Sequence, residues 1–149
     1  MLLVTLAIVL SACGSPSPTA FPELEPHGGL PADFAWQFKD GPDFYVYEAS
    51  SPSHSNCTVG LYFGTAPQFH PSATAQGRAG TLAGHPVVWE ESVVDGLHRA
   101  DTVLPYRHSA AHTELAIHAW VVAPRDADLG LFRASLATVS FSPRGNGPA

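Results

Sequence analysis

Branched and aromatic residues concentrate in five stretches of the chain, each bounded by residues that favour turns. The stretches are residues 43–49, 57–63, 86–94, 97–104 and 114–122. Runs of this length are typical of β-strands, and their succession favours antiparallel pairing in a meander. We therefore expect an antiparallel sheet of about five strands.

The dipeptide Asp95-Gly96 separates two of these runs by two residues. It predicts a tight hairpin turn, because both residue types tolerate the positive φ angles that such a turn requires. Closing the turn at this point places Val94 opposite Leu97 and Glu90 opposite Asp101. Residues 86–94 and 97–104 should therefore pair in this register.

The same register divides the side chains of the hairpin between two faces of the sheet. One face carries Glu90, Arg99 and Asp101, which we interpret as a local cluster of salt bridges. The other face is the predicted core side, and it carries Val87, Trp89, Val93, Ala100 and Leu104.

A helical period follows the last predicted strand. Leu129, Phe132 and Leu136 recur at the spacing of one helix face, and Asp126 stands where an N-cap residue is expected. The fold class is then α+β, an antiparallel sheet of about five strands with a C-terminal helix packed on one face.

Composition divides the chain into one globular domain and two flexible ends. Residues 13–32 are rich in proline, serine and glycine without a hydrophobic period, which is typical of an extended tether. Residues 33–141 form the predicted domain, and residues 142–149 are an expected disordered tail. Inside the domain, residues 64–84 show no strong period and predict a loop with a short hairpin near Ala83-Gly84.

The chain begins with an apolar run, residues 2–10. This run suits the core of a signal peptide and is too short for a spanning helix, which takes about 20 residues. Directly after it, Leu10-Ser11-Ala12-Cys13 resembles the lipobox of bacterial lipoproteins. The alternative is a buried first strand that ends in a core cysteine.

The resemblance implies a removed signal peptide, residues 1–12, and a lipidation site at Cys13. Palmitate-like acyl chains would hold the protein on the extracytoplasmic side of a membrane of the cell envelope, and several chains bind far more firmly than one. Because acylation would occupy the sulfur of Cys13, Cys57 is left without a disulfide partner and is expected in the core of its strand.

The charge of the chain argues against one class of partner. The formal net charge is −6, and Lys39 is the only lysine. A protein that neutralises phosphates needs a basic surface, so we expect no nucleic-acid partner.

Histidines are unusually frequent near the last predicted strand. His108, His112 and His118 fall close to Glu114, and a period of two places His112, Glu114 and His118 on one strand face together with Trp120. Imidazole and carboxylate groups suit zinc or copper. The specific hypothesis is a metal site at His112, Glu114 and His118, and the alternative is a set of histidines on a solvated strand face.

Two function classes remain after these observations. The chain holds no nucleophile elbow, no glycine-rich phosphate loop and no Cys-x-x-Cys pair, so no catalytic residues are predicted. The first hypothesis is a membrane-anchored, non-catalytic binding or assembly module, and the second is a metal-binding protein or metal-dependent enzyme that uses residues 108–118. Most of the aromatic residues should fill the core or cover its edge, but an exposed strip of them would suit an envelope protein, a peptide or a glycan.

Overall fold

The computed structural model describes residues 23–67, 69, 73–107 and 114–144. Nine strands, one α-helix and one short 3₁₀ helix follow one another along this part of the chain. They are β1 (Leu24–His27), β2 (Ala35–Asp40), β3 (Phe44–Ser50), η1 (Pro52–His54), β4 (Thr58–Gly64), β5 (Gln76–Leu82), β6 (His85–Val94), β7 (Leu97–Arg107), β8 (Glu114–Ala123), α1 (Asp126–Ala137) and β9 (Ser140–Pro143).

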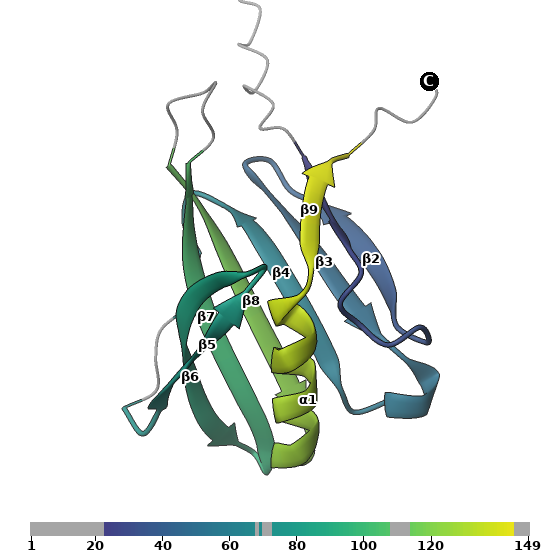
Figure 1. Cartoon of the computed structure of the whole chain (residues 1–149), viewed down its shortest axis with the longest axis vertical. Helices are drawn as coiled ribbons and strands as arrows, with labels where there is room; N and C mark the ends of the chain where they lie inside the picture. The colour runs from purple at the N-terminus through teal and green to yellow at the C-terminus, as the bar shows by residue number, and fades with distance from the viewer. Residues whose placement is uncertain (1–22, 68, 70–72, 108–113, 145–149) are drawn as a thin grey trace, which may run out of the picture.

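The main sheet has seven antiparallel strands in the order β2-β3-β4-β8-β7-β6-β5. Figure 1 shows how β2, β3, β4 and β8 lie beside one another in this sheet. The coarse prediction of an antiparallel sheet with one C-terminal helix is confirmed, whereas the number of about five strands and the simple meander are wrong. All five predicted strands exist, but β8 lies between β4 and β7 and thereby joins two separate meanders. The missed strands β2 and β5 form the two edges of the sheet, where side chains are mostly exposed and leave little hydrophobic pattern.

The predicted hairpin is confirmed in turn and register. Asp95 and Gly96 adopt φ angles of 52° and 78°, and Glu90 pairs with Asp101. Val93, which we assigned to the core side, is 60% exposed. It lies near the tip of the hairpin, two residues before the turn, where its neighbour Val94 is also exposed.

The segment that was expected to be a loop contains a second hairpin. Ala83 and Gly84 both have positive φ angles and connect β5 to β6. The short hairpin at this dipeptide is therefore confirmed, but its first strand runs back to Gln76. Gly77 and Gly80 interrupt the side-chain pattern of that strand, which explains why the sequence indicates a loop there.

Helix α1 covers one face of the main sheet and buries Leu129, Phe132 and Leu136, as predicted. These side chains share one hydrophobic core with Leu61 of β4 and Ile117 of β8. We call this side of the sheet the helix face.

The start of α1 differs from the prediction in one respect. Arg125 is the N-cap residue and Asp126 is already helical, and no side chain caps the first turn. Arg125 instead donates two hydrogen bonds to the carboxylate of Asp128. That carboxylate lies in the first turn, where the helix dipole favours negative charge.

Strand pairing also extends beyond the predicted domain limits of 33 and 141. Residues 24–27 form β1, although the composition indicates a tether there, and they pair with β9. Leu24 is buried in the core, and its backbone N–H donates a hydrogen bond to the Tyr45 hydroxyl. The apolar contact that secures β1 is made by one leucine among prolines, which is too little to produce a sequence pattern.

Candidate functional site

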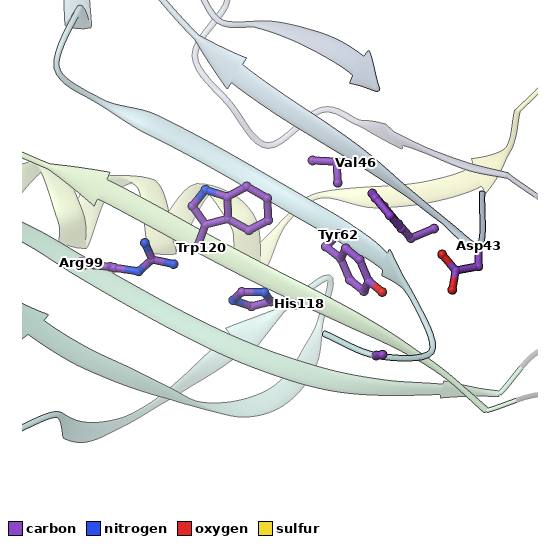
Figure 2. Close-up of a pocket in the computed structure, with 8 residues that line it drawn as sticks. Asp43, Val46, Tyr62, Arg99, His118 and Trp120 are labelled. Carbon is purple, nitrogen blue, oxygen red and sulfur yellow. The ribbon is translucent and has the colours of Figure 1, made fainter. Parts of the chain in front are cut away.

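The face of the main sheet opposite α1 carries a pocket of about 540 Å³. We call this side the open face. Tyr62, His118 and Trp120 reach it because side chains alternate along a strand, and their neighbours Leu61, Ile117 and Val121 belong to the core on the helix face. The pocket is lined by Asp43, Phe44, Val46, Tyr62, Ala66, Arg99, His118 and Trp120, which Figure 2 draws as sticks.

Two glycines of β4 let aromatic rings lie close to the backbone of the sheet. Gly60 pairs with Trp120 in the register, and the indole occupies the space that a Cβ of residue 60 would fill. The phenol of Tyr62 fills the corresponding space at Gly64. Glycine within a strand commonly marks such a close approach, so these two positions shape the floor of the pocket.

The rings around the pocket contact one another in pairs. Phe44 stacks on Tyr62 with centroids 5.5 Å apart, and Phe69 stacks on the imidazole of His118 at 5.2 Å. His118 also lies 5.3 Å from Trp120, with the two rings tilted by 44°. Such offset and tilted pairs are the favourable arrangements of aromatic side chains. The contacts thus form two groups, Phe44 with Tyr62, and His118 with Phe69 and Trp120, in which His118 is buried and the other rings are partly exposed.

A buried carboxylate lies beside these rings. Asp101 is 3% exposed, and Arg99 donates two hydrogen bonds to it over 2.6 and 2.8 Å. His118 Nε2 lies 2.9 Å from the Asp101 Oδ1 atom. A carboxylate can only accept hydrogen bonds, so Nε2 carries the proton and, in a neutral ring, Nδ1 is the acceptor.

Burial and hydrogen bonding act in opposite directions on Asp101. Burial raises the pKa of this carboxyl, but the hydrogen bonds from His118 and Arg99 outweigh it and hold the pKa below its ordinary value of 3.8. The same contact raises the pKa of the Arg99 guanidinium. The carboxylate and the guanidinium therefore form a neutral pair, and Arg99 brings little net charge to the pocket.

Asp43 lies at the other end of the pocket, with Tyr62, His118 and Trp120 between it and Arg99 (Figure 2). It is exposed and forms no ion pair with any described side chain. Its charge nevertheless reaches the neighbouring phenol. The pKa of Tyr62 is raised, mainly by burial and in smaller part by Asp43, against a hydrogen bond from the Ala66 backbone.

Two of the residues that were predicted to bind metal, Glu114 and His118, lie in β8. His108 and His112 lie outside the described residues, as does the predicted lipidation site Cys13. Glu114 begins β8 opposite Arg107. His118 lies four residues, or about 13 Å, further along the same strand, and its side chain contacts Asp101. Within the described ranges, no group of three or more potential ligands is arranged to hold a metal. The zinc or copper site stays a prediction.

Sequence reasoning placed Arg99 and Asp101 on one face, and the register confirms this. It expected most of the aromatic residues to fill the core or cover its edge, which holds for Tyr45, Phe63 and Trp89 but not for Phe44 and Tyr62. It placed Trp120 on the same strand face as His118, and both side chains line the pocket. The missed signal is alternation inside the aromatic runs, because adjacent rings such as Tyr62 and Phe63 must point to opposite faces.

A second polar cluster, at η1, contains Ser, His and Asp but is arranged as a cap. Ser51 caps the short helix, and Ser51 and Ser53 both donate hydrogen bonds to Asp33. These bonds lower the pKa of Asp33 to about 2. His54 Nδ1 lies 3.1 Å from Ser53 Oγ, but the hydroxyl donates to the carboxylate and not to the imidazole. The cluster thus stabilises a turn and lacks the geometry of an activated nucleophile.

Comparisons with known proteins identify no family: no family model, no curated protein and no solved structure matches the chain. None of the helices in the described ranges has the length and apolar character required to cross a membrane.

Proposed function

We propose that this protein is a lipid-anchored lipoprotein of the cell envelope whose folded part is a non-catalytic binding module. Cys13 carries the lipid anchor, and the pocket of the open face holds the ligand. The lipobox-like sequence at residues 10–13 supports the first part. The second part is supported by the pocket itself.

One observation carries the binding function. Partly exposed Phe44, Tyr62 and Trp120 line a concave site on the face of the sheet that α1 does not cover. Clefts lined by apolar and aromatic side chains with a few polar groups are the usual form of a ligand site. The pocket joins such a wall to Asp43 at one end and Arg99 at the other, so it offers both apolar contact and directional polar contact.

The anchor is tested by growing a bacterial host with an alkyne-bearing fatty acid and detecting label on the protein. We expect Cys13→Ala to remove the label and Cys57→Ala, the matched change at the other cysteine, to retain it, because Cys57 is buried. Label that persists in Cys13→Ala would overturn the anchor.

The pocket is tested in cells with a photoreactive phenylalanine analogue in place of Val46, which lines the pocket. The matched control places the same analogue at Leu131, an exposed apolar position of α1. We expect illumination to add a defined mass to the protein only from position 46. Adducts from both positions alike, or from neither, would contradict a ligand site in this pocket.

A further inference from the structure

Among the side chains that the structure describes, the charges around the pocket are not balanced. At one end, Arg99 is already paired with the buried Asp101 through two hydrogen bonds. At the other end, Asp43 has no ion-pair partner among the described side chains. The formal charge of the chain, −6, adds to the negative potential. A ligand that complements this pocket must therefore bring positive charge to the end that holds Asp43.

The aromatic rings favour the same kind of ligand. Phe44 follows Asp43 in the chain and stacks on Tyr62. Trp120 lies further from Asp43 along the pocket than Tyr62 does (Figure 2). The face of an aromatic ring is electrostatically negative and attracts cations, and Trp does so most strongly. A compact ammonium group with methyl or methylene substituents also gains apolar contact with these rings, which a hydrated metal ion does not.

We infer that the pocket binds an organic ammonium group, held by the Asp43 carboxylate and by the faces of Phe44, Tyr62 and Trp120. This inference rests on the proposed binding function and names the chemical class of the ligand. A free anion would face the unpaired Asp43, and Arg99 could attract it only against the charge of Asp101. A neutral sugar would use the rings but would leave the charge of Asp43 without a complement.

The test uses choline and neohexyl alcohol, in which a quaternary carbon replaces the quaternary nitrogen. The full chain is held in micelles of a polyoxyethylene detergent, which carries neither a sugar nor an ammonium group. The side chains of the three tryptophans give separate indole N–H signals in an NMR spectrum, and Trp120→Phe identifies the signal of Trp120. We expect millimolar choline to move this signal and leave that of the buried Trp89 in place, whereas neohexyl alcohol moves neither.

The role of Asp43 is tested by Asp43→Asn, with Asp95→Asn as the matched control. Both variants lose one negative charge, but Asp95 lies in the β6–β7 turn, where asparagine is equally suited to the backbone. We expect Asp43→Asn to weaken choline binding about fivefold. Asp95→Asn should leave the binding constant unchanged.

The outcomes separate this inference from the proposed function. Equal shifts with choline and neohexyl alcohol, or equal effects of the two Asn variants, would overturn recognition of the ammonium charge. A Trp120 shift with methyl glucoside or inorganic phosphate but not with choline would overturn the ligand class and retain the pocket as a binding site. If no probe moves the signal, the ammonium inference fails, and photo-crosslinking from position 46 decides independently whether the pocket holds another ligand.

Discussion

Glu91 and Asp101 lie on the paired strands β6 and β7, and their side chains leave the sheet on opposite faces. Each carboxylate is largely buried and contacts two basic side chains. Glu91 contacts Arg78 at 3.0 Å and Arg133 at 2.5 Å, and Asp101 contacts Arg99 and His118. As ion-pair clusters, the two are nearly equivalent.

The difference between them lies in what each cluster connects. Arg133 belongs to α1 and Arg78 to the edge strand β5, so the Glu91 cluster joins the helix to the sheet. The Asp101 cluster joins only the neighbouring strands β7 and β8, and its basic partners line the pocket. A buried ion pair alone therefore does not indicate a functional site. The aromatic pocket beside Asp101 distinguishes the open face from the helix face.

The largest expected effect is a difference in stability between variants of the tryptophans on the two faces. Trp89 is 1% exposed in the core of the helix face, whereas Trp120 is partly exposed on the open face. Trp89→Ala should lower the free energy of unfolding by about 3–5 kcal/mol, because it removes a large buried ring and leaves a cavity. Chemical denaturation followed by circular dichroism measures this loss. An equal loss for Trp120→Ala would contradict the division between the faces.

The two ion-pair clusters provide the next comparison. Asp101→Asn leaves the buried His118 and the half-exposed Arg99 without their carboxylate and should cost about 2 kcal/mol of unfolding free energy. Glu91→Gln should cost less, about 1 kcal/mol, and should leave choline binding unchanged because Glu91 lies on the helix face. Thermal or chemical denaturation of both variants checks the order, and a larger loss for Glu91→Gln would reverse the comparison.

The Asp101 cluster also predicts a dependence of stability on pH. The pKa of Asp101 is lower in the folded chain than its ordinary value of 3.8, so folding favours the ionised carboxylate. Its contribution is fully present above that value and is lost as the pH falls through the lower folded pKa. Denaturation curves measured from neutral pH down through this range should show a shallower loss of stability for Asp101→Asn than for the wild type. Identical slopes would show that Asp101 does not couple to folding.

The smallest expected effect is a gain in stability at Gly130 of α1. A Cβ at this position meets no atom within 4 Å, and glycine inside a helix costs about 0.5–1 kcal/mol relative to alanine. Gly130→Ala should therefore raise the free energy of unfolding by about that amount and leave the open face unaltered. A loss of stability, or a change in the indole signal of Trp120, would show that the two faces are coupled.

The sequence predicts the parts of this molecule that depend on local chemistry. The Asp95-Gly96 turn sets the β6–β7 register, and the spacing of Leu129, Phe132 and Leu136 indicates the buried side of α1. The sequence does not predict the edge strands β2 and β5, because their side chains are mostly exposed. It does not predict β1 either, because the apolar contacts of that strand are few. The placement of β8 beside β4 depends on tertiary packing, and no local pattern specifies it.

The sequence predicts only parts of the pocket, because the lining residues come from four strands and two loops. Arg99 and Asp101 follow from the hairpin register, but His118 meets Asp101 only through the pairing of β7 with β8. In the sequence alone, Gly60 indicates only a position where glycine destabilises a strand. Its role, to leave room for the ring of Trp120 on the next strand, becomes visible only in the folded chain.

The measurement that tests the account most directly is the choline titration of Gly60→Ala, followed through the indole signal of Trp120. The added methyl group must displace the Trp120 ring, while Gly77→Ala, the matched change elsewhere on the open face, contacts only Val88 at 3.2 Å and the end of Glu90. We predict that Gly60→Ala shifts the free Trp120 signal and abolishes its response to choline, and that Gly77→Ala responds like the wild type. An unchanged choline response in Gly60→Ala would contradict a binding site built on the rings of the open face.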